Sequence, residues 1–280
     1  MKRFLLVSLL TVWFYFYVMF ALLWAQVKPA SPSLQAGWST NCIRALLLNE
    51  GTGTTVDDMS PVDAACALNV STLWASDTEG NYVDTGLAFG NDYISLNTGL
   101  PGAGINSLTW YWRINWFYSS GAILGLAATF TGSPPTSDIQ WYSPVENMEP
   151  QFLILNASDV CVACNIPNAF QFAQNTKYNV IGTYDGDSIK VYVNGVKKCS
   201  VAQTGNIRNH GYTTRVGEGT NGEVGGAGNC GGASVNFPRM KVYTICVWQR
   251  VITSTEIAQI QDDPYVMFGA GGGRRRQIVQ

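Results

Sequence analysis

Residues suited to acid–base or metal chemistry are few in this chain. His210 is the only histidine, so a metal site built from several histidines is excluded. A serine–histidine–aspartate triad would have to form around His210, which lies in a polar stretch, and we interpret it as a surface loop residue. The acids Glu146 and Glu149 stand between Pro144 and Pro150. Because proline removes hydrogen-bond donors from a strand, this pair is typical of a solvated turn.

A tryptophan-rich segment has the alternation of a β-strand. Successive side chains of a strand point to opposite faces. One face of this segment collects only apolar residues, namely Leu108, Trp110, Trp112, Ile114 and Trp116. We predict that this face belongs to a core rather than to a ligand surface, because aliphatic side chains share it with the indole rings.

Trp141 and Tyr142 are better candidates for ligand contact. They follow a proline-containing loop at 133–137, so we expect at least one ring to stay exposed for stacking on a sugar. The alternative is a half-buried aromatic pair in a strand. Glu218 and Asn221 belong to a glycine-rich loop at 217–232, long enough to be a binding loop or a mobile one. These four residues make up the predicted carbohydrate site.

Two tight turns punctuate the alternating segment 181–195. Asp185-Gly186 and Asn194-Gly195 are dipeptides that favour positive φ, as hairpin turns require. Aromatic residues make up 12% of the chain and charged residues only 13%, and short alternating runs recur along it. This composition predicts an all-β sandwich.

The stretches Gly182–Gly186 and Tyr192–Gly195 resemble the signature hairpin of the laminin-G-like branch of the concanavalin A-like lectin/glucanase superfamily. The resemblance extends over about residues 43–268, through the segments 46–58, 86–96, 241–250 and 254–257. The ending 263–268 is similar to endings common in laminin-G-like proteins of bacteriophages and marine bacteria. The resemblance implies a two-sheet antiparallel jelly-roll sandwich with a short C-terminal helix.

The family resemblance also has implications for glycoside hydrolysis and for calcium binding. Glycoside hydrolases on this jelly roll carry acids at alternate positions of one strand, and this chain has no such Glu-x-Asp-x-Glu pattern. Asp58, with Asp57 beside it, matches a calcium ligand of many family members, whereas the amide-bearing turn that follows in the family is replaced by 61–65. The alternative is a solvated acidic turn. Lys177 stands where the family usually has a tryptophan.

Seven cysteines in an exported chain predict disulfides with one thiol left over. Cys161 and Cys164 have the spacing of a redox or metal motif, but they lack a second pair, and we interpret them as a small loop staple or two unpaired thiols. In the resembled fold the first and last strands are antiparallel neighbours. Cys42 and Cys246 lie on those strands, so a bridge between them is a further possibility that depends on register.

The N-terminal segment 1–25 predicts export. Lys2 and Arg3 precede an apolar run at 4–25, which is either a cleaved signal peptide or a retained helical anchor across ~30 Å of hydrocarbon. A spacer at 26–40 then leads into the domain at 41–268, and a flexible tail at 269–280 ends with Arg274–Arg276. Both interpretations place the domain outside the cytoplasm.

The sequence favours a recognition function. A net charge of −2 without an internal basic patch argues against nucleic-acid binding. We expect an exported, non-enzymatic module that binds a cell-surface or matrix glycan, with calcium as a possible cofactor and the membrane as a partner if 4–25 is retained. The alternatives are a structural or decoration protein of a virion or surface appendage, assembled into a larger particle, and a divergent glycoside hydrolase.

Overall fold

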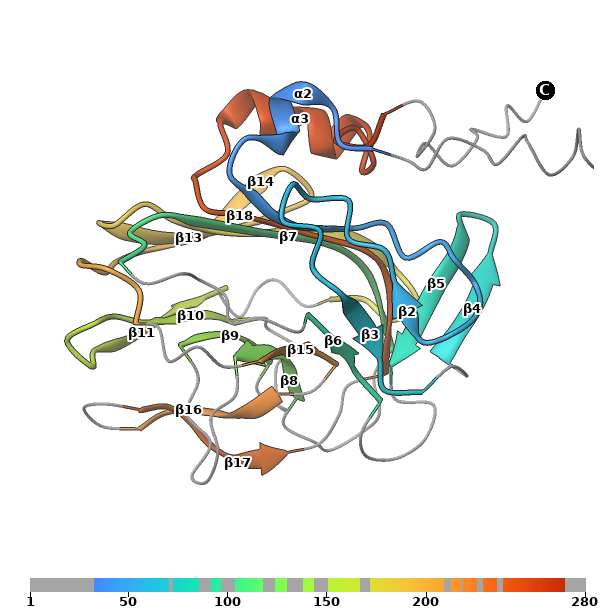
Figure 1. Cartoon of the computed structure of the whole chain (residues 1–280). Helices are drawn as coiled ribbons and strands as arrows, with labels where there is room; N and C mark the ends of the chain where they lie inside the picture. The colour runs from blue at the N-terminus through green and yellow to red at the C-terminus, as the bar shows by residue number, and fades with distance from the viewer. Residues whose placement is uncertain are drawn as a thin grey trace, which may run out of the picture.

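The computed structural model describes residues 33–70, 73–85, 92–96, 104–117, 124–129, 138–143, 151–166, 172–208, 213–217, 219–225, 229–235 and 239–269. Within these ranges most residues lie in antiparallel strands that form two facing sheets (Figure 1). The predicted all-β sandwich is therefore confirmed. The predictions for 1–32, Glu146, Glu149, His210, Glu218 and 270–280 fall outside the described residues.

The first sheet has eight strands in the described part of the chain. Seven follow the order β14 (Val196–Ala202), β13 (Ser188–Val193), β12 (Lys177–Tyr184), β7 (Leu108–Phe117), β18 (Arg239–Trp248), β5 (Gly80–Thr85) and β4 (Trp74–Asp77). The eighth, β1 (Cys42–Leu46), pairs with the second half of β18, antiparallel as expected for the first and last strands. Strands β7, β12 and β18 form the centre of this sheet.

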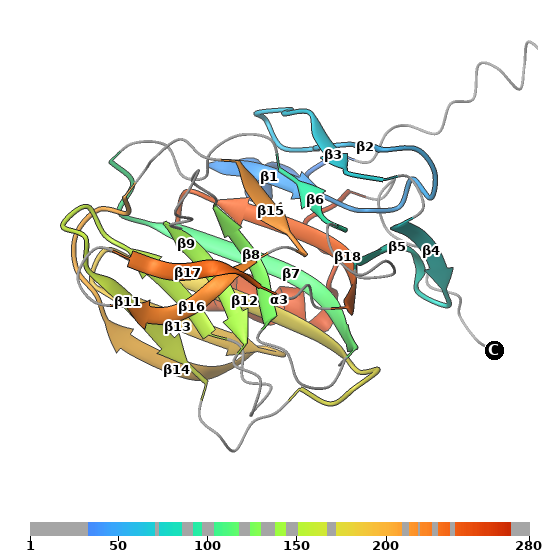
Figure 2. The same cartoon turned by 90° about the horizontal axis from the view of Figure 1, so that it is seen from below.

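The second sheet also has eight strands within the described ranges. Their order is β11 (Cys161–Asn165), β10 (Gln151–Leu155), β9 (Ile139–Ser143), β8 (Leu124–Thr129), β15 (Thr214–Val216), β6 (Ile94–Ser95), β3 (Cys66–Leu68) and β2 (Thr55–Val56). The glycine-rich segment predicted as a loop forms a separate hairpin of β16 (Gly219–Gly225) and β17 (Asn229–Val235). This hairpin contacts the second sheet from outside (Figures 1 and 2).

Two turns have the geometry that their residue types predict. Asn194 and Gly195 have φ of 49° and 75° and join β13 to β14. Gly186 has φ of 89° in the turn between β12 and β13, where the Asp185 carboxylate accepts hydrogen bonds from the backbone of the next residues. Positive φ at both glycines suits tight turns that reverse twisted strands.

Tryptophan rings fill the space between the two sheets. Trp110, Trp112 and Trp116 are fully buried there, which confirms the core face predicted for this strand. Trp141 reaches the same core from β9, and the centre of its ring lies 4.5 Å from the centre of the Phe152 ring. A Cβ atom on Gly182 of β12 would lie 2.6 Å from the Phe152 ring, so only glycine lets the sheets approach this closely.

A second apolar layer covers the outer face of the first sheet. Helices α2 (Ala36–Ser39) and α3 (Ser254–Asp262) lie on that face, over β7 and β18 (Figure 1). The N-cap Thr253 and Glu256 form a capping box, which begins α3 where the sequence resemblance placed the short helix. Ile257 and Ile260 of this helix are buried against the sheet. Within the described residues, neither helix has the length and apolar character needed to span a membrane.

A disulfide joins the edges of the two sheets. Cys164 of β11 and Cys199 of β14 are bonded, with their Cα atoms 5.8 Å apart, and Cys161 is disulfide-bonded as well. Cys161 and Cys164 therefore do not close a small loop with each other, because Cys164 links the second sheet to the first. The predicted bridge between Cys42 and Cys246 is wrong, because both are free thiols. Register explains this: Cys42 opposes Trp248 whereas Cys246 opposes Ala45, so the two cysteines are offset along the strands.

Candidate functional site: a charged cluster on the outer face of the first sheet

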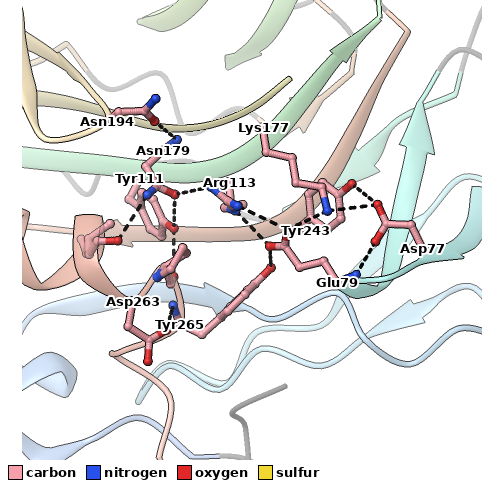
Figure 3. A network of polar contacts seen from close by, with 12 residues as sticks. Asp77, Glu79, Tyr111, Arg113, Lys177, Asn179, Asn194, Tyr243, Asp263 and Tyr265 are labelled. Carbon is pink, nitrogen blue, oxygen red and sulfur yellow. Dashed lines mark hydrogen bonds and ion pairs between the residues drawn. The ribbon is translucent and has the colours of Figure 1, made fainter. Parts of the chain in front are cut away.

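A cluster of charged and tyrosine side chains lies on the outer face of the first sheet, on the same side as α3 (Figure 3). Strand alternation places it there. Because β7 directs its tryptophans into the core, the intervening Tyr111, Arg113 and Asn115 are directed to the opposite face. The turn after β4 and the segment after α3 supply further members of the cluster, Glu79 and Tyr265.

Glu79 is the centre of the cluster. Arg113 donates to both oxygens of the Glu79 carboxylate, from Nε to Oε1 at 2.9 Å and from Nη2 to Oε2 at 3.2 Å. Lys177 Nζ of β12 lies 2.7 Å from the second oxygen, and the Tyr265 hydroxyl donates to the first. A carboxylate that receives a bidentate guanidinium and two further donors is fixed in position.

Asp77, at the end of β4, extends the cluster. The Tyr243 hydroxyl donates to its carboxylate at 2.7 Å, and Lys177 Nζ lies 3.2 Å from the same oxygen. The ammonium of Lys177 also lies 4.7 Å from the centre of the Tyr243 ring, within cation–π range. One lysine therefore joins two acids and an aromatic ring.

Arg113 also connects the cluster to the helical layer. Its Nη1 donates to the Asn179 carboxamide oxygen at 3.1 Å, and the Tyr111 hydroxyl donates to the Pro264 carbonyl at 2.9 Å. The Asn179 amide donates to the carbonyl of Ile260 in α3. The C-terminal segment is thus held on the sheet by side chains of β7 and β12.

Both acids stay ionised well below neutral pH. Burial opposes the charge on Glu79, but the hydrogen bonds from Arg113, Lys177 and Tyr265 outweigh it and lower its pKa to about 2. Burial likewise opposes the charge on Asp77, and its hydrogen bonds still lower its pKa.

The neighbouring tyrosine shows the opposite shift. Burial and the adjacent Asp77 carboxylate raise the pKa of Tyr243 well above its usual range, so its hydroxyl remains a donor.

A glycosidase needs one carboxylic acid kept protonated by a raised pKa. Asp77 and Glu79 are unsuited to that role, and the cluster instead offers fixed hydrogen-bond donors and acceptors.

A second lysine, Lys241, lies beside the charged cluster. Lys241 of β18 and Lys177 of β12 both stand opposite Asn115 of β7 in register, one on each side. The Lys241 ammonium lies 4.6 Å from the centre of the Tyr82 ring, and that ring lies 5.3 Å from the Tyr243 ring. The two lysines therefore cover two buried tyrosines on either side of one asparagine.

The predicted carbohydrate residues are distributed differently. Trp141 has no exposed surface, so the expectation that its ring stacks on a sugar is wrong. Trp141 shares the inner face of β9 with Ile139, because side chains two residues apart in a strand point to the same side, and both belong to the core between the sheets. Strand β16, which carries Asn221, contacts strand β9, which carries Tyr142. Glu218 lies outside the described residues.

The residues predicted to bind calcium have other partners. Asp58 is buried and accepts hydrogen bonds from the backbone of Ala45, Ser60 and Ala64, and Arg44 lies 3.7 Å from one of its oxygens. A guanidinium already supplies the positive charge there, and Asp57 is exposed. Among the described residues no group of three or more histidine, cysteine, aspartate or glutamate side chains is placed to hold a metal. These residues do not fit calcium, which stays a prediction of the resemblance alone.

Sequence reasoning missed the cluster because its members are far apart in the chain. Two signals were present. The polar residues Arg113 and Asn115 alternate with the tryptophans of β7, and Lys177 departs from the tryptophan that is usual in the resembled family. The structure places all three on one face.

Comparison with known proteins gives matches by structure alone. No protein-family model matches this chain, and no curated protein sequence matches it. The receptor-binding domain of botulinum neurotoxin D is similar, with a TM-score of 0.58 and 11% identity over 82% of this chain and 54% of that chain. The binding domain of Paraclostridial Mosquitocidal Protein 1 has a TM-score of 0.57 and 12% identity, over 81% of this chain and 53% of that one.

An enzyme structure is similar to a lower degree. Trypanosoma rangeli sialidase in complex with sialic acid has a TM-score of 0.52 and 14% identity, over 79% of this chain and 32% of that chain. This chain thus spans about half of each binding-domain chain and about a third of the sialidase chain. At such identities the likeness is one of fold: this chain is a two-sheet antiparallel β-sandwich similar to receptor-binding domains and to part of a sialidase.

Proposed function

We propose that this protein is an exported recognition module that binds carbohydrate on the outer face of the first sheet. The observation that carries the proposal is the charged cluster itself. Asp77 and Glu79 come from the end of β4 and the turn after it, Arg113 from β7 and Lys177 from β12, and their side chains are 16–24% exposed. Sugars are recognised by rigidly placed donors and acceptors, and this cluster has both within reach of solvent.

Binding is favoured over hydrolysis by the state of the acids. Asp77 and Glu79 both have lowered pKa values, so neither would deliver a proton to a leaving group at neutral pH. Receptor-binding domains among the structural neighbours support recognition at the level of fold, and the sialidase supports hydrolysis only as a weaker analogy.

Export is supported by two features. The disulfide between Cys164 and Cys199 is typical of proteins that fold in an oxidising compartment. The apolar run at 4–25 behind Lys2 and Arg3 is typical of a secretory or anchoring segment. We infer that the domain functions outside the cytoplasm.

A glycan array followed by calorimetry on the best ligand tests this function. Lys177→Ala should weaken binding by roughly ten-fold or more, since hydrogen bonds to charged groups contribute about 1.5–3 kcal/mol. Lys197→Ala is the matched control, because Lys197 is an exposed lysine on the edge strand β14 of the same sheet. Its affinity should equal that of the wild type.

Three results would count against the proposal. Absence of binding across a broad panel would overturn carbohydrate recognition and leave the sandwich as an interaction block between proteins. Equal losses in the Lys177 and Lys197 variants would move the binding surface away from the cluster. Release of reducing sugar by the wild type would show that the module is catalytic.

A further inference from the structure

The carboxamide of Asn115, which lies between Lys177 and Lys241 in the sheet, has an acceptor without a partner among the described residues. Asn115 is 6% exposed, and within the described part of the chain its Oδ1 atom accepts no hydrogen bond. Its amide group lies beside the Tyr243 hydroxyl and contributes to the environment of that tyrosine. Buried acceptors are nearly always paired in folded proteins, so an unpaired one calls for an explanation.

The residues that flank Asn115 on the adjacent strands have side chains that can move. Lys177 and Lys241 stand on either side of it in register, and both are only partly buried. Their ammonium groups lie over the rings of Tyr243 and Tyr82. Lysine has a long, flexible stem, so either side chain can swing away without moving a strand.

We propose that Asn115 is the floor of a sugar-binding site and that a hydroxyl of a neutral sugar donates to its Oδ1 once a lysine has moved aside. This inference rests on the proposed function and names its ligand class. A second, adjacent hydroxyl accepts from the displaced lysine and donates to the Asp77 carboxylate. Neutral sugars with neighbouring free hydroxyls supply both donor and acceptor at this spacing.

Charge balance favours a neutral ligand over an acidic one. The two acids Asp77 and Glu79 are matched by the two cations Arg113 and Lys177, which leaves no net charge in this part of the cluster. Lys241 stands opposite Asp84 on the neighbouring strand, which gives another pair of opposite charges. A carboxylated sugar would therefore gain little attraction, and it would meet two carboxylates.

Substitution of Asn115 separates a ligand contact from a structural role. Asn115→Leu keeps the number of side-chain heavy atoms and removes both the unpaired acceptor and the amide beside the Tyr243 hydroxyl, so the melting temperature should change little. Affinity for the neutral glycan should fall at least ten-fold. Asn115→Asp keeps an acceptor at this position and should bind within about three-fold of the wild type, because the hydroxyl retains its partner.

The outcomes distinguish this inference from the proposed function. A wild-type protein that binds no glycan refutes the function. A wild-type protein that binds while Asn115→Leu binds equally well refutes only the role of Asn115, and so does an Asn115→Asp variant that loses as much affinity as Asn115→Leu. If Asn115→Leu fails to fold, Asn115→Ala removes the acceptor without adding bulk and is judged by the same criterion.

Salt dependence tests the ligand class. Glycan beads carrying neutral or carboxylated sugars are compared at about 50 mM and about 500 mM sodium chloride, between which exposed charges become strongly screened. Binding to neutral sugars should be unchanged between the two. Binding that is confined to carboxylated sugars and weakens with salt would overturn the neutral class.

Discussion

Truncation of Trp141 tests whether this residue is a core side chain or a ligand platform. Its ring has no exposed surface, stacks on Phe152 at 4.5 Å and lies 5.3 Å from the ring of Trp112. Strand pairing on both sides of β9 limits how far the backbone can move into a cavity. Trp141→Ala should therefore lower the free energy of unfolding by about 3–5 kcal/mol.

The loss is measurable by urea denaturation and by calorimetry. For a domain of this size each kcal/mol shifts the melting temperature by roughly 2–4 °C, so the variant should melt about 6–20 °C lower. At room temperature its folded fraction should keep the wild-type affinity for any glycan bound at the proposed site, because the ring lies between the sheets and not on that face. A stable variant that had lost binding would show that the ring is exposed and would refute the assignment to the core.

Two tryptophan-to-phenylalanine substitutions provide the control. The Trp141 indole nitrogen has no partner among the described residues, whereas the buried Trp248 indole donates to the Trp38 carbonyl at 2.8 Å. Trp248→Phe should therefore cost about 1 kcal/mol more than Trp141→Phe, since only the former breaks a hydrogen bond. Equal costs would mean that the Trp141 nitrogen is paired after all.

Three further predictions concern turns, charge and the disulfide. Gly195→Val should destabilise the domain by at least about 1 kcal/mol in urea denaturation, because φ is 75° and the new Cβ would lie 3.2 Å from Gln261; no change would refute the turn geometry. Glu79 has a folded pKa of about 2, lowered from 4.5, so its contribution to stability is complete above pH 4.5 and is lost as pH falls toward 2. Glu79→Gln should flatten that part of the stability–pH curve, and an unchanged curve would contradict the pairing. Replacement of Cys164 and Cys199 by serine should cost about 2–4 kcal/mol, and if the variant is as stable as the oxidised wild type, the cross-sheet link is absent.

Local features of this protein followed from sequence alone. Glycine and asparagine at 194–195 determine a tight turn whatever the strands pair with, because positive φ is a property of the residues themselves. Period-two alternation was enough to assign Trp110 and its neighbours to the core. The short helix α3 was expected from the family resemblance, and in the structure Thr253 and Glu256 begin it through hydrogen bonds that span only three residues.

Long-range arrangement was decided only by tertiary structure. Periodicity separates the two faces of a strand but does not say which face meets the other sheet, so Trp141 was a candidate for exposure together with Tyr142 and lies in the core. The register of β1 on β18 sets Cys246 opposite Ala45 and Cys42 opposite Trp248, and this offset keeps the two thiols apart. The charged cluster joins Glu79, Arg113 and Tyr265, whose spacing in sequence carries no trace of their contact. Sheet pairing brings them together because an antiparallel sandwich forms most of its contacts between distant segments.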